Sequence, residues 1–298
     1  MEVVRIRPRG YCHGVVEAIR IAKQVGEERR GQPVTMLGYL VHNEHVTRDL
    51  QEHGVRLVTQ SNRMKGLDEI DGGTVIFTAH GISPAVVEEA KARGLDVVDA
   101  TCSDVTRTHD LVRRLTDEGC HVIYIGKRGH PEPAGAMGVA PQQTTLVESI
   151  AEVDDLDFPA GMRLAVTCQT TLSMWDTRAI IERLAERFPA IEVHNEICLA
   201  TQERQEAAVA AATDVECVVV VGSPRSSNSQ RLVQVVTERA GRPAHLVDSA
   251  DELRPEWFAG MQRVGVTAGA STPTQLTRAV IAALEAMPNA PVGAATNR

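Results

Sequence analysis

One pattern recurs three times along this chain of 298 residues and limits the folds open to it. In each third of the chain, a cysteine stands where an amphipathic segment with helical spacing begins. These are Cys12, Cys102 and Cys198, which are separated by 90 and 96 residues. A thiolate at a helix N-terminus faces unpaired N–H groups and the positive end of the helix dipole, so we expect a lowered pKa there. Such a cysteine suits a nucleophile or a metal ligand.

A second element recurs at a fixed offset. In each third, a buried apolar run ends at a glycine, and a polar residue stands four positions after that glycine. The glycines are Gly38, Gly126 and Gly222, and the polar residues are His42, His130 and Ser226.

A third element follows in each repeat. In each repeat a short apolar run ends at a valine, which is Val58, Val147 or Val247. Twenty residues later a threonine closes another apolar run, at Thr78, Thr167 and Thr267. A polar loop and a helix come next. Ser83-Pro84 and Thr272-Pro273 are expected to start two of these helices, with a capping hydroxyl before proline.

Each repeat therefore reads cysteine, helix, strand, polar loop, strand, strand, polar loop, helix and strand. Alternating strands and helices predict mainly parallel sheets covered by helices, which bind ligands at the carboxyl ends of their strands. We expect three similar α/β units whose carboxyl ends face a common centre. The predicted boundaries are residues 14–102, 103–198 and 199–285, the third repeat being completed by the N-terminal strand segment 1–13. Residues 286–298 are expected to form a loose tail.

Charge and composition exclude several partners. The chain carries 31 Lys and Arg against 39 Asp and Glu, a net charge of −8, which argues against nucleic acid as a partner. The sequence has no uninterrupted apolar run long enough to predict a membrane span. Its N-terminus lacks a signal-peptide layout, so we expect a cytoplasmic protein.

The three repeated cysteines leave a fourth ligand position open. Structural zinc sites require a closed shell of four ligands, whereas a cluster held by three thiolates keeps one iron available to substrate. This arithmetic favours an iron–sulfur cluster over zinc. The other three cysteines, Cys120, Cys168 and Cys217, have the sequence setting of small core residues.

Polar residues gather in the repeated loops. Any one of them fits solvation or turn capping, but nine at related positions indicate a polar site. They are His42, His80, His130, Glu132, Thr170, Ser226, Ser227, Asn228 and Ser271. The segment 222–229 is rich in neutral donors and lacks a Walker lysine, so it is interpreted as an anion cradle.

These residues stand in motifs that resemble the 4-hydroxy-3-methylbut-2-enyl diphosphate reductase (IspH/LytB) family. The motifs appear in the family's order from residue 8 to about residue 285: Pro-Arg-Gly-Tyr-Cys-His-Gly-Val (8–15), Val-His-Asn (41–43), Ala-His-Gly (79–81), Asp-Ala-Thr-Cys (99–102), Gly-His-Pro-Glu (129–132), Gln-Thr-Thr-Leu-Ser (169–173), Ile-Cys-x-Ala-Thr (197–201), Ser-Ser-Asn-Ser (226–229) and Val-Thr-Ala-Gly-Ala-Ser (266–271). Two positions depart from the pattern. Ser103 stands where proline is common, and His13 stands where alanine is common.

The resemblance implies a trefoil of three α/β units around an oxygen-sensitive [4Fe–4S] cluster, the fourth iron being open to substrate. Cys12, Cys102 and Cys198 would hold the cluster. Glu132 would donate a proton at the allylic hydroxyl, with Thr170 and His130 in the catalytic group. The diphosphate would be bound by His42, His80, His130, Ser226, Ser227, Asn228 and Ser271. Thr170 would bind the substrate at its allylic hydroxyl.

The implied reaction is reductive loss of the hydroxyl as water, which yields isopentenyl and dimethylallyl diphosphate in the last step of the non-mevalonate isoprenoid pathway. The chain has no G-x-G-x-x-G fingerprint, so electrons would come from an external donor such as ferredoxin or flavodoxin. The residues alone leave three alternatives open. These are a non-redox iron–sulfur dehydratase, a cluster-based sensor and a zinc hydrolase.

Overall fold

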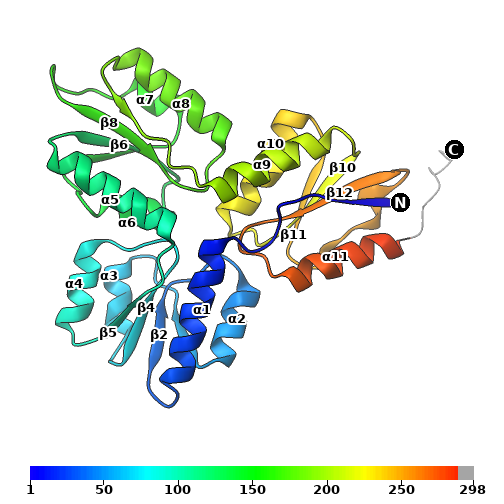
Figure 1. Ribbon diagram of the computed structural model, residues 1–298, viewed down its shortest axis with the longest axis horizontal. Helices are drawn as coiled ribbons and strands as arrows, with labels where there is room; N and C mark the ends of the chain where they lie inside the picture. Colours follow the sequence, from blue (N-terminus) through cyan, green and yellow to red (C-terminus); the bar gives the residue numbers. More distant parts are fainter. Residues whose placement is uncertain (288–298) are drawn as a thin grey trace, which may run out of the picture. The chain divides into compact units, whose positions relative to one another are not determined.

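The computed structural model describes residues 1–287, which form three four-stranded sheets flanked by helices (Figure 1). Every strand pair within the described residues is parallel. The expected α/β class with three parallel-sheet units is therefore confirmed. The chain divides into two compact units, which we call the continuous unit (His13–Cys198) and the discontinuous unit (Met1–Cys12 and the chain from Leu199 onward).

The continuous unit contains the first two repeats. The first repeat consists of α1 (His13–Glu28), β2 (Val34–Leu37), α2 (Glu44–Glu52), β3 (Val55–Val58), α3 (Arg63–Gly66), a 3-10 turn (Leu67–Glu69), β4 (Thr74–Phe77), α4 (Pro84–Ala92) and β5 (Asp96–Asp99). The second consists of α5 (Ser103–Asp117), β6 (His121–Ile125), α6 (Pro131–Met137), β7 (Thr144–Val147), α7 (Ile150–Asp154), β8 (Leu164–Cys168), α8 (Met174–Arg187) and β9 (Glu192–Val193).

The discontinuous unit contains the third sheet, to which the N-terminal strand contributes. Its elements are β1 (Glu2–Arg5), α9 (Leu199–Ala212), β10 (Cys217–Val221), α10 (Ser227–Ala240), β11 (Ala244–Val247), two 3-10 turns (Ala250–Glu252 and Pro255–Phe258), β12 (Arg263–Ala268) and α11 (Thr274–Ala286). β1 pairs with β12 at the sheet edge. The predicted loose tail begins at the last residue of α11, and its residues from 288 onward lie outside the described part of the chain.

All three sheets share one strand order. They read β3-β2-β4-β5, β7-β6-β8-β9 and β11-β10-β12-β1, so the second strand of each repeat lies outside the first and the third lies on its other side. After the first strand the chain therefore moves toward one edge of the sheet, and from the third strand onward it moves toward the opposite edge. The switch point lies between the first and third strands. In open parallel sheets, ligands bind at the carboxyl edge beside such a switch point.

The predicted repeat omitted the helices between its first and third strands, including one directly after each first strand. The polar residue that follows each first strand leads into α2, α6 or α10 rather than directly into the next strand. The reason is local. Asn43, His130 and Ser226 each accept a hydrogen bond from a backbone N–H of the following turn and so act as N-caps.

Two finer predictions are wrong. Ile76, Thr167 and Thr267 occupy equivalent positions opposite Met36, Tyr124 and Val220, so Thr78 lies two residues beyond the position assigned to it. Val58 and Ile76 are 18 positions apart, whereas the matching pairs Val147 and Thr167, and Val247 and Thr267, are 20 apart. A two-residue offset keeps a side chain on the same sheet face.

The predicted hydroxyl caps do not form. Ser83 is the N-cap of α4 without a side-chain capping bond, and it packs against Gly138 instead. The fully buried Thr272 donates its hydroxyl to the carbonyl oxygen of Val221, the last residue of β10, at 2.9 Å. This bond to the strand takes the place of the expected bond to the helix.

The cores are built from valine, isoleucine, leucine and alanine on both faces of the sheets. Cys120, Cys168 and Cys217 are at most 1% exposed and belong to these cores. Burial raises the pKa of the Cys168 and Cys217 thiols to about 12, so these groups stay protonated.

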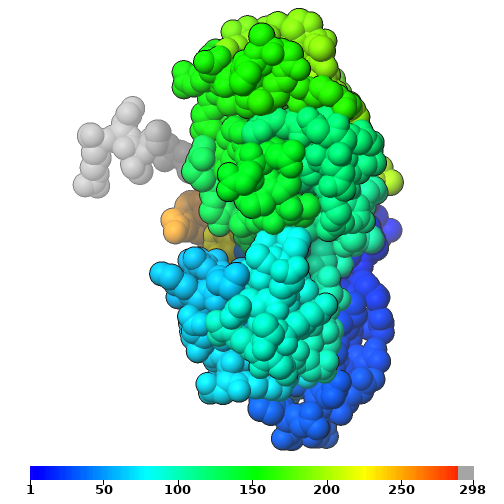
Figure 2. All heavy atoms as spheres, turned by 90° about the vertical axis from the view of Figure 1, so that its left-hand side faces the viewer, coloured from blue at the N-terminus to red at the C-terminus, as the bar shows by residue number. Residues whose placement is uncertain are grey.

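Within the continuous unit the first two repeats are in direct contact, as the adjoining cyan and green surfaces in Figure 2 show. Small residues make this contact close. A Cβ at Gly135 would lie only 3.2 Å from the backbone carbonyl carbon of Gly81. No helix of the described residues is long and apolar enough to cross a membrane.

Ile6 tests whether the N-terminal segment belongs to the core of the discontinuous unit. It is 3% exposed, packs against Gly265 and donates its N–H to the Val266 carbonyl oxygen at 2.9 Å. Ile6→Ala should lower the free energy of unfolding by about 2–5 kcal/mol in chemical denaturation. The control Val16→Ala removes a half-exposed side chain and should change it by no more than about 0.5 kcal/mol. Equal effects of the two substitutions would show that the segment is not part of the core.

Candidate active site

The predicted polar residues follow the first and third strands of each sheet, on either side of the switch points. His42 follows β2 and His80 follows β4. His130 and Glu132 follow β6, and Thr170 follows β8. In the discontinuous unit, the segment from Ser226 to Asn228 follows β10, and Ser271 follows β12.

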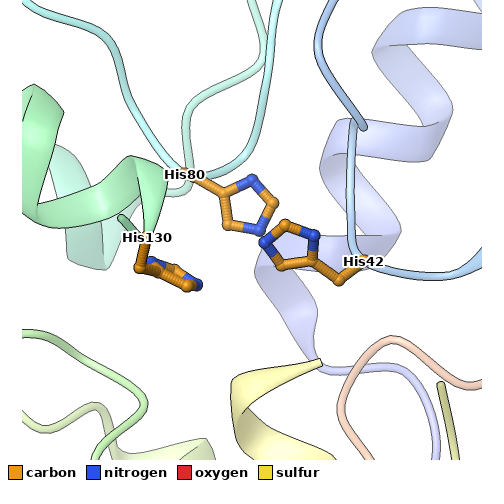
Figure 3. Close-up of side chains that lie close together, drawn as sticks. All are labelled: His42, His80 and His130. Atoms are coloured by element: carbon orange, nitrogen blue, oxygen red, sulfur yellow. The ribbon is translucent and has the colours of Figure 1, made fainter. Parts of the chain in front are cut away.

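The continuous unit brings three histidines together (Figure 3). The ring of His42 lies 4.3 Å from that of His80 and 5.3 Å from that of His130, and the rings of His80 and His130 are 5.5 Å apart, measured between centroids. One ring nitrogen from each lies within 4.8 Å of the others, which is close enough for the three imidazoles to share an anion or a metal ion.

His80 and His130 favour the neutral form. Burial, followed by repulsion from His42, His130 and Arg63, lowers the pKa of His80 well below its ordinary value. Burial, followed by His42 and Lys127, lowers the pKa of His130 to about 3. A neutral imidazole can donate one N–H hydrogen bond and can take up a proton when an anion arrives.

Glu132 is a buried carboxyl in the first turn of α6, with 2% of its surface exposed. Burial is the largest influence and raises its pKa to about 7, although hydrogen bonds from Thr170 act in the opposite direction. The backbone N–H of Thr170 donates to Oε1 of Glu132 at 2.7 Å. A carboxyl with this pKa can hold a proton near neutrality and release it, as a general acid must.

Each of the three repeated cysteines follows the fourth strand of its sheet and precedes a helix. Its backbone N–H donates to the carbonyl of the residue two positions beyond the end of the third strand. The acceptors are Ala270 for Cys12, Ala79 for Cys102 and Thr170 for Cys198, all at 3.1 Å. The equivalence proposed from spacing therefore extends to the backbone hydrogen bonds.

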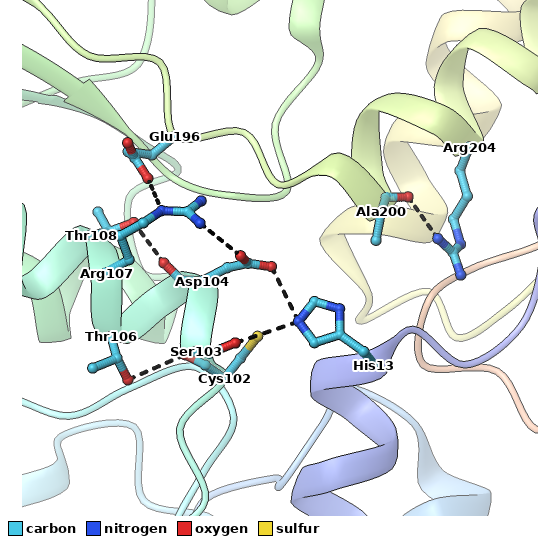
Figure 4. A network of polar contacts seen from close by, with 10 residues as sticks. All are labelled: His13, Cys102, Ser103, Asp104, Thr106, Arg107, Thr108, Glu196, Ala200 and Arg204. Atoms are coloured by element: carbon cyan, nitrogen blue, oxygen red, sulfur yellow. Dashed lines mark hydrogen bonds and ion pairs between the residues drawn. The ribbon is translucent and has the colours of Figure 1, made fainter.

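The sulfur of Cys102 packs closely against the backbone of Gly14. A Cβ at Gly14, in the first turn of α1, would lie 2.3 Å from Sγ of Cys102, so only glycine permits the present approach. Figure 4 shows the polar groups beside it. Asp104 lies 3.6 Å from Nε2 of His13 and 3.2 Å from Nη1 of Arg107, and Arg107 donates from Nε to Glu196 at 2.8 Å.

In the discontinuous unit, Asn228 occupies the place that Glu132 has in the second repeat. Its Oδ1 accepts the N–H of Ala270 at 2.9 Å, as Oε1 of Glu132 accepts that of Thr170. Ser226, Ser227 and Ser271 are between 4% and 7% exposed. The candidate polar residues thus stand at repeat-related positions. At the position of Glu132, the third repeat has the amide Asn228 in place of a carboxyl.

The sequence analysis missed three polar residues, of which Gln169 and Arg204 are buried and Arg63 is half-buried. The guanidinium of Arg63 overlies Gly38 and lowers the pKa of His80. Gln169 accepts the N–H of Lys127 at 2.9 Å and holds the turn after β6. Arg204 donates to the carbonyl oxygen of Gly10, two residues before Cys12, at 2.8 Å. Arg63 and Arg204 stand on helices with ordinary surface composition, so only the structure reveals their burial. Gln169 lies in the repeated polar loop after β8, and this position could have identified it from the sequence.

Three parallel four-stranded sheets, repeated cysteines and buried acid–base side chains at the switch points define an α/β protein with the groups of an acid–base active site. The sequence model described as "LytB protein" matches residues 3–285, and the chain belongs to the LytB family.

Relatives of known name agree. The chain is 54% identical over 286 residues to 4-hydroxy-3-methylbut-2-enyl diphosphate reductase of Symbiobacterium thermophilum, covering 96% of this chain and 97% of that one. It is 52% identical to the enzyme of the same name from Halalkalibacterium halodurans, covering 96% and 91%. It is also similar to the solved E-1-hydroxy-2-methyl-but-2-enyl-4-diphosphate reductase of Plasmodium falciparum, with 33% identity, a TM-score of 0.91 and coverage of 100% and 93%.

The raised pKa of Glu132 predicts a pH-dependent stability. Its folded-state pKa of about 7 lies above the ordinary value of 4.5, so the folded state binds the proton more tightly. The stabilisation is present below about pH 4.5 and is lost as the pH rises toward 7, by up to about 1.4 kcal/mol per pH unit.

Glu132→Gln, which cannot titrate, should remove this dependence. The unfolding free energy of the parent minus that of the variant should fall between pH 5 and pH 7 in urea denaturation. Glu203→Gln, which removes an exposed carboxyl, supplies the control. A difference that stays constant across this range would contradict the assignment.

Proposed function

We propose that this chain is a 4-hydroxy-3-methylbut-2-enyl diphosphate reductase, which removes the allylic hydroxyl of its substrate as water. The balanced step takes up two electrons and two protons, breaks the C–O bond and forms a C–H bond. Its products are isopentenyl and dimethylallyl diphosphate, the end of the non-mevalonate isoprenoid pathway. The observation that carries the proposal is Glu132, a buried carboxyl with a pKa of about 7 placed two residues after a histidine of the three-histidine cluster.

Cys12, Cys102 and Cys198 are proposed to hold a [4Fe–4S] cluster. The fit rests on their equivalent backbone hydrogen bonds and on Gly14, whose lack of a side chain accommodates the Cys102 sulfur. When bound, such a cluster supplies electrons from an external donor such as a ferredoxin or flavodoxin, and its fourth iron acts as a Lewis acid.

The residues of the chain then divide the remaining work. His42, His80 and His130 are proposed to bind the diphosphate, because each brings an imidazole nitrogen to one place. Ser226, Ser227, Asn228 and Ser271 are proposed to bind it as well, as neutral donors at the related positions of the discontinuous unit.

Glu132 holds the proton that the leaving hydroxyl needs. The N–H of Thr170 donates to Oε1 and its side chain also hydrogen-bonds the carboxyl, so Glu132 keeps a fixed orientation while it holds the proton. A protonated hydroxyl leaves as water, which is a far better leaving group than hydroxide.

An anaerobic assay with purified, reconstituted protein tests the function. One equivalent of substrate should consume two reducing equivalents from dithionite-reduced methyl viologen and yield the two named products. Water loss without consumption of reductant would identify a non-redox dehydratase instead.

Iron content tests the cysteine assignment. Cys12→Ser, Cys102→Ser and Cys198→Ser should each lose most bound iron and sulfide after anaerobic reconstitution. Cys217→Ser is the control. It should keep the iron and lower stability by about 1–3 kcal/mol, because it buries a hydroxyl in an apolar core. Iron loss in Cys120→Ser combined with retention in Cys102→Ser would contradict the assignment.

Turnover tests the role of Glu132. Glu132→Gln preserves the shape and the acceptor for Thr170 but cannot deliver a proton, so turnover should fall about 10²–10⁴-fold. Iron content and substrate affinity should stay near the parental values. A variant with parental turnover would exclude Glu132 as the acid.

Proton uptake tests the histidine cluster. His80 and His130 are neutral near pH 7, and a bound diphosphate raises their pKa values. Binding should therefore take up protons, and affinity should rise as the pH falls. Calorimetric titration with inorganic diphosphate in buffers of different ionisation enthalpy measures the uptake, which His80→Asn should reduce. Equal uptake by parent and variant would contradict this role.

A further inference from the structure

The discontinuous unit contains a cavity of about 660 Å³ that shares no wall residue with the proposed substrate site. One wall is the N-terminal segment from Arg5 to Gly10, and the other is α11, which runs along this segment in Figure 1. This volume lies within the range typical of small-molecule sites.

Four arginines line the cavity. Arg5, Arg7 and Arg9 come from the N-terminal wall and Arg278 comes from α11. The wall also contains one carboxylate, Glu285, which lies 2.8 Å from Nη2 of Arg5. Among the described residues, Arg7, Arg9 and Arg278 form no ion pair. Three uncompensated cations thus meet in one cavity of a chain whose net charge is −8.

Arg9 shows that this crowding has an energetic cost. Its Nη1 donates to the carbonyl oxygen of Ile6 at 3.0 Å, which fixes the side chain in a partly buried position. Burial, followed by repulsion from Arg7 and Arg5, lowers the pKa of Arg9. An anion in the cavity would relieve this repulsion.

α11 adds two further features. Its first residue, Thr274, lines the cavity, so the positive end of the helix dipole lies there. Thr277, one turn further along α11, also lines the cavity.

We propose that this cavity binds a small molecule that carries a di- or triphosphate group. Guanidinium groups bind phosphate oxygens in pairs through their planar forks, and arginines on two opposite walls suit a ligand with several phosphates. The concave shape favours a small molecule over the acidic face of a protein partner. This site is independent of the proposed reductase activity.

Calorimetric titration of the full chain with inorganic diphosphate tests the proposal. The protein should bind two equivalents, one of which depends on the arginines. The double substitution Arg7→Gln and Arg278→Gln, at two exposed positions, should weaken that equivalent at least about tenfold and leave the other unchanged. His80→Asn should leave the arginine-dependent equivalent unchanged, so that a failure of the proposed substrate site is recognised separately.

Arg239→Gln, at an exposed position on α10, is the matched control for loss of charge and should leave both equivalents intact. Equal weakening by this control would reduce the effect to general charge and overturn the proposal. Absence of an arginine-dependent equivalent would overturn it as well. If an acidic [2Fe–2S] ferredoxin bound in an Arg278-dependent manner and diphosphate did not, the surface would be a protein docking site and the proposal would be wrong.

Discussion

The backbone of Thr170 joins two parts of the proposed site, the acid and one of the cysteines. Its N–H donates to Glu132 at 2.7 Å, and its carbonyl accepts the N–H of Cys198 at 3.1 Å. One peptide segment beyond β8 thus fixes both a buried acid and a cysteine. Ala270 makes the same two bonds in the discontinuous unit, to Asn228 and Cys12. The parallel sheet makes this arrangement possible, because the third and fourth strands end at the same edge and the segments that follow them meet there.

This arrangement also explains why a carboxyl is tolerated in the interior. A buried carboxyl is costly when charged, and the N–H of Thr170 offsets only part of that cost, so the pKa settles near 7 rather than near 4.5. Asn228 makes the equivalent bond without a titratable proton. The second and third repeats therefore share this backbone geometry, and they differ in that Glu132 supplies an acid where Asn228 supplies an amide.

Much of this organisation follows from the sequence because it is repeated. The cysteine spacing, the strand–glycine–polar offset and the parallel sheets all depend on local patterns that occur three times. The misplacement of Thr78 has a different origin. The position in β4 that is equivalent to Thr167 and Thr267 is Ile76, two residues before Thr78. A shift of two residues leaves inward-facing and outward-facing side chains on the same sheet faces, so no hydrophobic pattern reveals it. Helix α6 was missed because seven residues containing two prolines and a glycine carry little helical periodicity. The burial of Arg63 depends on its packing over Gly38, a contact between residues 25 positions apart that no local pattern encodes.

The chain places two kinds of cationic chemistry in two separate regions. The proposed substrate site uses imidazoles that are neutral before an anion arrives, so its charge can follow that of the ligand. The cavity beside α11 uses guanidiniums, which remain charged whether or not a ligand is bound. Titratable donors suit a site whose ligand must leave after reaction, because the protons taken up on binding can be released again. Permanent charges suit binding without chemistry. The difference in side-chain type is thus a physical reason to assign turnover to the histidine cluster and binding alone to the arginine-lined cavity.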